Sequence, residues 1–441
     1  PIASLPCREN GGAAGGAAEG VGQREVEKMR VNRAILLRAF PLCVALSVVV
    51  LALLTLMIFP ERAWENDTPS YVATAQSLFS GEGFSSNGQP ELFRTPGYPL
   101  LLVIGVALNS FWIVSLLQYG MMALILFLTV RIAKNFYPNS KNISPLYWWL
   151  LLLSPHFLSY PAFLLSETLF TAMLVGSIWF FVQWRKTRRT TQLLASFLLM
   201  ALLPIVRPIG LVLLPIYGVF CLFIFWRERC RVKLSKSRQL FAVLGLSLLL
   251  VFPTMAWSYR NALVNDLFSV SSVSSYNLYH YTAAHLQAKR EGRSEAEVQA
   301  EFNRNEENWR RQHPNATAGD FARWAQQEGM RSFLETPLLS TALYLRSGLA
   351  AFLPEAVQLN ELFGLSKGNR GTLSVLHQEG LFAAVHHYFS DQPAALFIAV
   401  GATLWSLLFL AALARALRSL LFKGDELLWF LTITAFAQLF V

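Results

Sequence analysis

The sequence predicts an all-α protein that crosses a membrane several times, and three observations lead to this prediction: composition, long apolar blocks and the placement of charge. The 441 residues have a mean hydropathy of +0.41, and 54% are hydrophobic while only 15% are charged. A soluble domain would carry about 25% charged residues. The apolar residues lie in long runs with almost no charge, as membrane-spanning helices do. Backbone polar groups must pair internally in lipid, so each run is expected to be helical.

About nine apolar blocks are candidate membrane spans. They cover about 34–59, 111–133, 146–160, 163–184, 193–206, 209–226, 240–257, 394–414 and the stretch from 427 onward. Two other apolar stretches, 97–108 and 337–353, are short, and the second is interrupted by Arg346. We expect these two stretches to form interfacial helices rather than spans.

The orientation follows from the basic connectors between the blocks. When the blocks are counted from a cytoplasmic amino end, every strongly basic connector falls on the cytoplasmic side, as the positive-inside rule requires. This count places a first outer loop at 60–96 and a second outer region at 258–393 on the external face. We therefore predict a multi-pass protein of the inner (plasma) membrane whose outer loops face the periplasm or exterior. The net charge of +10 resides mainly in these connectors, so we expect no nucleic-acid partner.

The two ends of the chain differ from the membrane core. Residues 1–28 are rich in Gly and Ala, and Met29 opens a plausible membrane-protein start, so we expect 1–28 to be disordered and non-native. The core is then a single domain, 29–441, and its final apolar run suggests that the natural chain continues. None of the four cysteines, Cys7, Cys43, Cys221 and Cys230, falls in an outer segment, so no external disulfide framework is expected.

Five charged residues come from separate parts of the sequence, yet this topology brings all of them to the outer face. They are Asp67, Arg94, Glu167, Arg207 and Arg260. Each also has a structural interpretation: the Asp could cap the helix that follows it, the arginines could contact lipid headgroups, and the Glu could pair with an arginine. Taken together, an acid with several arginines at a membrane surface suits a lipid substrate that carries phosphate.

Several other kinds of site are not indicated. The sequence has neither a P-loop nor a GxSxG motif, so a soluble type of nucleotide site is not expected. His386 and His387 are adjacent, and adjacent residues on a helix do not share a face, so we predict no metal site there. No cofactor is indicated, although the need for a divalent metal stays open.

Short motifs in the first outer loop resemble a known family. The chain reads DTPSYVATAQSLFSGEGF from Asp67, which fits D-x-x-x-Y-x-x-x-A-x-x-L-x-x-G-x-G-F, and then RTPGYPL from Arg94. The stretches SETLF, RPIGLVLLP and RN follow in order. Over about 60–280, the chain resembles the bacterial branch of the GT-C superfamily, membrane glycosyltransferases related to dolichyl-phosphate-mannose protein mannosyltransferases and to the aminoarabinose transferases of lipid A.

The resemblance implies a GT-C-like helical bundle and a reaction. Such enzymes move a sugar from a polyprenyl-phosphate carrier to an acceptor hydroxyl outside the membrane, with inversion. Asp67 would be the catalytic base, and the substrate-binding candidates would be Arg94, Tyr98, Glu167, Arg207, Arg260 and Asn261. The protein mannosyltransferases carry Asp-Glu where this chain has Asp67-Thr68, which argues against a protein acceptor.

Two other functions remain as alternatives. A transporter or flippase for polyprenyl lipids or glycolipids would place charges at mid-membrane and repeat broken helices in matching halves. A non-catalytic protein that binds polyprenyl lipids during envelope assembly would keep the arginines without needing Asp67. The sequence leaves open the sugar, the acceptor (a glycan, a lipid or a protein) and the oligomeric state.

Overall fold

The computed structural model describes residues 50, 64, 67–136, 159–228, 236–350, 380–389 and 393–423. These residues are almost entirely helical, apart from one two-stranded antiparallel hairpin, as the all-α fold class requires. The predicted spans at 34–59, at 146–160 and from 427 onward lie almost wholly outside the described residues, as do residues 1–28 and Cys7, Cys43 and Cys230.

The elements follow one another along the chain with these bounds. They are α2 Thr68–Phe79, β1 Ser85–Ser86, β2 Gln89–Pro90, α3 Gly97–Ala107, α4 Trp112–Phe136, α7 Glu167–Thr187, α8 Thr190–Val206, α9 Gly210–Glu228, α10 Lys236–Asn265, α11 Val273–Asn277, the π-helix η1 Leu278–Ala283, α12 Ala284–Glu291, α13 Glu295–Gln312, α14 Ala318–Glu335, α15 Pro337–Ala350, α18 Leu381–Phe389 and α19 Pro393–Lys423.

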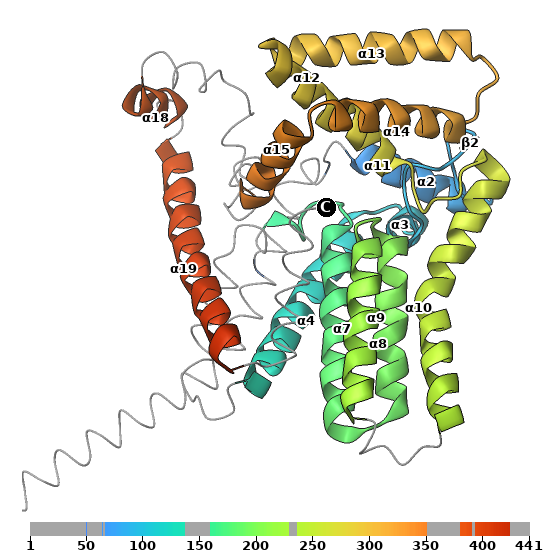
Figure 1. Cartoon of the computed structure of the whole chain (residues 1–441), viewed down its shortest axis with the longest axis vertical. Coiled ribbons are helices and arrows are strands. Elements are labelled where there is room, and N and C mark those ends of the chain that lie inside the picture. Colours follow the sequence, from blue (N-terminus) through green and yellow to red (C-terminus); the bar gives the residue numbers. More distant parts are fainter. Residues whose placement is uncertain are drawn as a thin grey trace, which may run out of the picture.

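The helices form two layers, a bundle and a cap (Figure 1). The bundle consists of α4 and α7–α10, in which α7 packs on α4 and α8, and α8 packs on α9 and α10. The cap consists of α11–α14 together with η1 and lies across one end of the bundle. Helices α2 and α3 pack on each other between the two layers.

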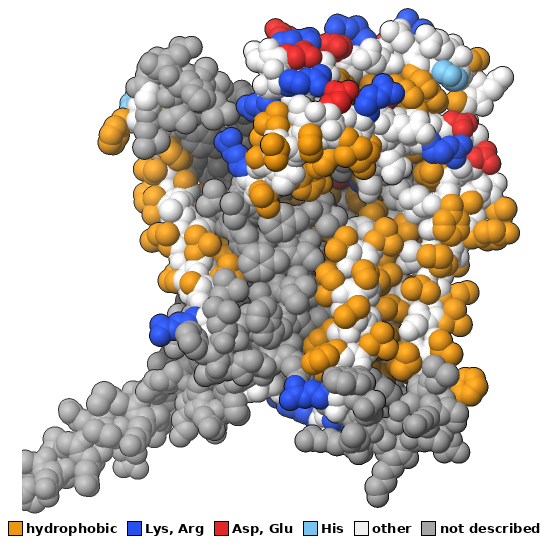
Figure 2. All heavy atoms as spheres, viewed as in Figure 1, with side chains coloured by type: hydrophobic (Ala, Val, Ile, Leu, Met, Phe, Trp, Pro, Cys, Tyr) orange, Lys and Arg blue, Asp and Glu red, His pale blue; other side chains and the backbone are white. Residues whose placement is uncertain are grey.

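Hydrophobic side chains cover the flanks of the bundle, whereas charged side chains gather at its ends (Figure 2). Asp, Glu, Lys and Arg mix on the cap, and Lys and Arg lie at the opposite end of the bundle on the face in view. Helix α10 exposes a row of large apolar residues that includes Phe241, Leu244, Leu248 and Phe252. Within the described residues, two helical stretches are long and apolar enough to cross a membrane, Trp112–Asn135 and Phe241–Asn265, and α8, α9 and α19 contain shorter apolar stretches.

Small and polar residues hold the bundle helices together. The Ser177 hydroxyl donates to the Ser196 carbonyl at 2.8 Å, and the Ser196 hydroxyl donates to the Ser177 carbonyl at 2.7 Å. The Tyr217 hydroxyl from α9 joins them, 2.5 Å from the Ser196 hydroxyl. Interhelical hydrogen bonds of this kind are the usual polar contacts between helices in an apolar environment.

Two helix boundaries differ from the sequence prediction. The fourth block was expected from residue 163, but α7 begins at Glu167 because residues 160–166 form turns and bends, in which the Ala162 N–H donates to the Ser159 carbonyl at 3.0 Å. The seventh block was expected to end at 257, but α10 continues to Asn265. Hydropathy marks where apolar character ends, and a helix can continue beyond that point in polar residues. The two short apolar stretches form helices, α3 and α15; their place at a membrane interface stays a prediction.

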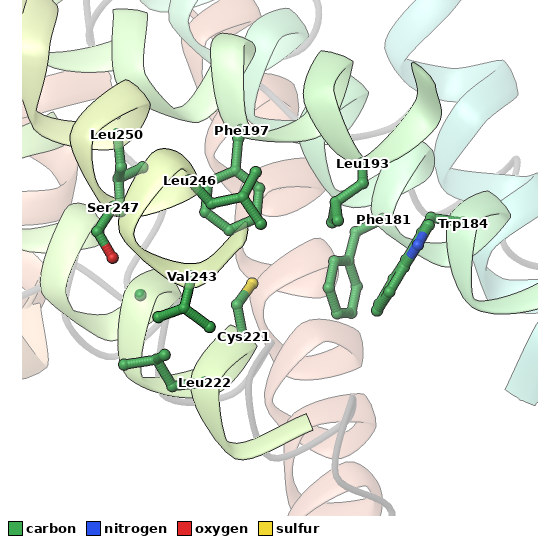
Figure 3. Close-up of a pocket in the computed structure, with 11 residues that line it drawn as sticks. Phe181, Trp184, Leu193, Phe197, Cys221, Leu222, Val243, Leu246, Ser247 and Leu250 are labelled. Carbon is green, nitrogen blue, oxygen red and sulfur yellow. The ribbon is translucent and has the colours of Figure 1, made fainter. Parts of the chain in front are cut away.

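An apolar crevice among the bundle helices does not hold the candidate site. Figure 3 shows this crevice among α7–α10, lined mainly by apolar side chains, together with the free thiol of Cys221 and the hydroxyl of Ser247. Its volume is about 30 Å³, which is room for a water molecule but not for a sugar. None of the candidate catalytic or substrate-binding residues lines it.

The cap is docked on the bundle through a glycine. A Cβ atom on Gly319 of α14 would overlap the carbonyl oxygen of Asn265, the last residue of α10, and would approach Leu267 Cβ to 3.0 Å. The Thr317 side chain also donates to the Asn265 carbonyl at 3.3 Å. The start of α14 therefore rests directly on the backbone end of α10.

Gly319→Ala is expected to weaken this docking and to destabilise the cap by about 1–3 kcal/mol or more, because backbone rather than a flexible side chain must move. Thermal unfolding of the purified protein in detergent measures the effect on stability. Limited proteolysis of the folded protein measures the effect on the cap. The control is Gly245→Ala in α10, where no heavy atom lies within 4 Å of the added Cβ and where the change should slightly favour the helix. Equal unfolding temperatures for the two variants would contradict this docking contact.

Candidate functional site

Asp67 and Arg94 form a bidentate ion pair. Arg94 Nη2 lies 2.8 Å from Asp67 Oδ1, and Nη1 donates to Oδ2 at 3.2 Å. Asp67 occupies the N-cap position of α2, but its side chain makes no capping hydrogen bond. Its carboxylate pairs with Arg94 instead. The Asp67 side chain is 58% exposed, whereas that of Arg94 is 9% exposed. A carboxylate open to solvent is thus held in place by a buried guanidinium.

Arg94 is itself held from several sides. Its Nε donates to the Ser70 hydroxyl at 2.8 Å, and its guanidinium lies 4.4 Å from the centre of the Tyr71 ring and 4.8 Å from that of Phe93. The Glu91 side chain accepts hydrogen bonds from the backbone of Phe93 at 2.6 Å and of Arg94 at 3.0 Å, which fixes the loop that carries the arginine. The position of the guanidinium is therefore set by rigid neighbours before any ligand binds.

Burial alone would lower the pKa of Arg94, but the hydrogen bond to Asp67 and the nearby Tyr71 and Asp67 side chains raise it above the ordinary arginine value. The net shift is upward, so the guanidinium keeps its positive charge throughout the range in which proteins are stable.

A second ion pair joins Glu167 and Arg207. Glu167 is the first residue of α7, and Arg207 follows the last residue of α8, so two neighbouring bundle helices contribute one charge each at the same end. Both side chains are about a third exposed, at 30% and 34%. Among the described residues, the other carboxylate oxygen of Glu167 is buried without a hydrogen-bond partner.

Tyr71 contacts one ion pair directly and the sequence neighbour of the other. Its ring lies under Arg94, and its hydroxyl lies 3.3 Å from the hydroxyl of Ser166, the residue next to Glu167. We call the five residues Asp67, Tyr71, Arg94, Glu167 and Arg207 the charged cluster. The sequence prediction had brought four of these residues to one face, whereas Tyr71 was a fixed position of the motif but not a candidate site residue. The signal was present, because Tyr71 stands four residues after Asp67 and so lies on the same face of α2.

The motif that follows Arg94 attaches the first loop to the bundle. The Thr95 hydroxyl donates to the Val206 carbonyl at 2.8 Å. A Cβ atom on Gly97 would lie 2.7 Å from a Val206 methyl carbon and 2.9 Å from the Ile205 carbonyl oxygen. Because Arg207 follows immediately, this contact brings the loop of one ion pair beside the helix end of the other.

Tyr98 is fully buried, which differs from the substrate-binding role that the motif implied. Its hydroxyl donates to Gln118 Oε1 at 2.9 Å, and the Gln118 amide donates to the Phe163 carbonyl at 2.7 Å and the Pro161 carbonyl at 3.1 Å. Tyr98 therefore joins α3 to α4 and to the turn before α7. Gln118 carried no sequence signal, because a single polar residue in an apolar block does not reveal its partner.

Arg260 and Asn261 lie near the end of α10, where their hydrogen bonds hold loops. Arg260 Nη2 donates to the Phe84 carbonyl at 2.9 Å, and Nη1 donates to the Glu91 carbonyl at 3.0 Å and to Asn261 Oδ1 at 2.9 Å. The Asn261 amide donates to the carbonyls of residues 269 and 270 at 2.8 and 3.1 Å. Among the described residues, no hydrogen bond or ion pair joins Arg260 to the charged cluster, which differs from the expectation that it faces a phosphate beside Asp67.

No metal site accompanies these residues in the part of the chain that the structure describes. No group of three or more His, Cys, Asp or Glu side chains is placed to hold a metal ion there. His386 and His387 lie on the short helix α18 and are exposed.

The comparisons with known proteins give one structural similarity. No protein family and no curated protein matches the sequence. Among solved structures, the chain is similar to ArnT from Cupriavidus metallidurans bound to undecaprenyl phosphate, with 12% identity, a TM-score of 0.41, and coverage of 90% of this chain and 76% of that one.

Arg260→Lys is expected to lower stability by about 1–3 kcal/mol, because one ammonium group cannot reproduce a planar fork that bridges two carbonyls. If the chain binds a polyprenyl phosphate, as its sequence leads us to expect, this change should alter the affinity little, whereas Arg207→Lys should weaken it clearly. Thermal unfolding and binding of the lipid in nanodiscs measure both effects. Arg311→Lys, whose side chain is 75% exposed, is the stability control. Loss of lipid affinity in Arg260→Lys without loss of stability would instead place Arg260 at the phosphate.

Proposed function

We propose that this chain is a membrane glycosyltransferase that moves a sugar from a polyprenyl-phosphate carrier to an acceptor hydroxyl, with the charged cluster as its active site. The observation that carries the proposal is the open Asp67 carboxylate, held by a buried arginine. A second acid–arginine pair begins at Glu167, next to Ser166, which Tyr71 contacts. An acid that can accept a proton and arginines that can bind phosphate are the groups that this reaction needs. The motif resemblance over residues 60–280 points to the same chemistry.

In the proposed reaction, the acceptor hydroxyl attacks the anomeric carbon of the donor sugar. The new bond forms between the acceptor oxygen and that carbon, the bond to the carrier phosphate breaks, and the hydroxyl proton passes to Asp67. Its exposed side chain leaves room for a hydroxyl within hydrogen-bond reach. A single displacement of this kind inverts the configuration at the anomeric carbon.

The carrier leaves as a polyprenyl phosphate, and arginine would stabilise its charge. The ion pair to Glu167 uses Nη1 of Arg207, so other donors of its planar guanidinium can bind phosphate oxygens. Arg94 would add positive charge beside the reacting carbon while it orients Asp67. Glu167 would hold Arg207 or bind a sugar hydroxyl.

We further propose that the protein is a multi-pass protein of the inner membrane and that the charged cluster faces the periplasm or exterior. The exposed apolar residues of α10, the two helices long enough to cross a membrane and the basic connectors support this placement. The partners are then a polyprenyl-phosphate sugar donor, an acceptor and membrane lipid. A transporter or flippase is less favoured, because the described ion pairs of the bundle lie at the end next to the cap rather than midway along it.

Asp67→Asn is expected to lower the release of polyprenyl phosphate from a supplied sugar donor by about 100-fold, within the range for loss of a general base. The amide keeps the shape of the carboxylate but cannot accept the proton. Purified protein with native lipids and radiolabelled polyprenyl-phosphate sugars provides the measurement. Asp266→Asn is the matched control, because Asp266 is exposed and has a positive φ of 54°, which asparagine also adopts readily.

No release by the wild type from any donor, together with equal lipid binding by wild type and Asp67→Asn, would favour the non-catalytic lipid-binding function. Equal release by wild type and variant would remove Asp67 from the mechanism.

Tyr71→Phe is expected to reduce turnover by up to roughly tenfold, because it removes a single neutral hydrogen bond to Ser166 and keeps the ring under Arg94. Tyr71→Leu should reduce turnover further, since it also removes the aromatic face. Steady-state kinetics with varied donor separate the effects on kcat from those on KM. Tyr281→Phe, at an exposed tyrosine of η1, should behave as wild type. Equal losses in the Phe and Leu variants would show that the ring contributes nothing.

A further inference from the structure

A cleft separates the first loop from the cap next to the charged cluster. It has a volume of about 340 Å³ and is lined on the loop side by Gln89, Glu91 and Phe93 and on the cap side by Tyr276, Arg310 and Phe321. This volume lies within the range of small-molecule sites, roughly 300–1,000 Å³.

The walls of the cleft are fixed by contacts that need no ligand. The backbone N–H of Ser272 donates to the Leu92 carbonyl at 3.0 Å, and the Ser271 hydroxyl donates to the Phe93 carbonyl at 2.5 Å. The rings of Phe93 and Tyr276 meet edge to face, with centroids 5.4 Å apart. The first loop and the cap are thus joined at the base of the cleft, which preforms its shape.

The cleft adjoins the proposed active site through a single side chain. The ring of Phe93 lines the cleft and also lies 4.8 Å from the guanidinium of Arg94, the partner of Asp67. Only the Phe93 side chain would therefore separate a ligand in the cleft from the Arg94 guanidinium.

The lining indicates a neutral, hydroxyl-rich ligand. Arg310 does not offer a free positive charge, because it pairs with Glu306 at 2.8 Å and lies 4.1 Å over the Phe321 ring. The Glu91 carboxylate would repel an anion, and the polar Gln89 and Glu91 side chains do not suit a lipid chain. Aromatic faces together with an amide and a carboxylate match a sugar ring, which has apolar C–H faces and hydroxyls at its edge.

We propose that this cleft binds the saccharide part of the acceptor, so that the acceptor is a glycan. The proposal rests on the transferase function proposed above and adds its acceptor class. A sugar ring in the cleft would lie against Phe93 and Tyr276, with its hydroxyls directed to Gln89. The hydroxyl that is glycosylated would extend past Phe93 toward Asp67.

The test blocks the cleft without removing a contact. Ala318 lines the cleft at the first turn of α14 and is exposed, so Ala318→Trp adds bulk there. The matched control is Ala296→Trp, at an exposed position in the first turn of α13 that does not line the cleft. The purified full chain in nanodiscs is titrated with di- and trisaccharides of glucose, mannose and N-acetylglucosamine, with saturation-transfer NMR as the readout. Release of polyprenyl phosphate is assayed on the same preparations.

Binding of at least one saccharide by wild type and by Ala296→Trp, with a tenfold or greater loss of affinity in Ala318→Trp, is the expected result. Equal binding by the two Trp variants would place the saccharide elsewhere and overturn the proposal. A wild-type protein that releases polyprenyl phosphate but binds none of these saccharides would overturn the glycan acceptor while keeping the transferase. Saccharide binding that is lost in Ala318→Trp, in a protein that releases no carrier, would keep the cleft as a saccharide site and overturn the transferase.

Discussion

The close contact between residues 95–97 and the carboxyl end of α8 is the constraint on which the charged cluster depends. A threonine hydroxyl and a glycine without a side chain let the first loop lie directly on the Val206 backbone. Arg94 precedes this contact in the loop and Arg207 follows it in the bundle, so the two arginines are brought together by their sequence neighbours. A larger residue at position 97 would separate the loop from the helix end and the two ion pairs from each other.

The local sequence could predict the helices but not how they meet. Apolar runs predicted α4, α8, α9 and α19, and interfacial stretches predicted α3 and α15, because hydropathy reports the environment of a helix. The break at 161–162 was predicted, but its extension through 163–166 was missed, since those residues are mostly as apolar as those of a helix. The polar end of α10 was missed for the opposite reason: helix geometry continued after hydropathy had ended.

Of the candidate residues, the topology could bring charges to one face but could not assign partners. The ion pair of Asp67 with Arg94 and that of Glu167 with Arg207 each join residues that are at least 27 positions apart. Nor did motif membership separate a residue that faces open space, such as Asp67, from one that is fully buried, such as Tyr98. Burial is decided by packing between elements that are distant in sequence, and a motif records only spacing.

The hydrogen bonds from Arg260 to the first loop also have a mechanical consequence. This arginine stands near the end of α10, which exposes a row of large apolar residues, and binds the carbonyls on either side of the β1–β2 hairpin. A helix that spans a bilayer tilts to match the thickness of the hydrocarbon layer. Because the guanidinium joins α10 to the hairpin, a change in the tilt of α10 would also move the hairpin. The width of the cleft above it would then depend on the thickness of the surrounding lipid.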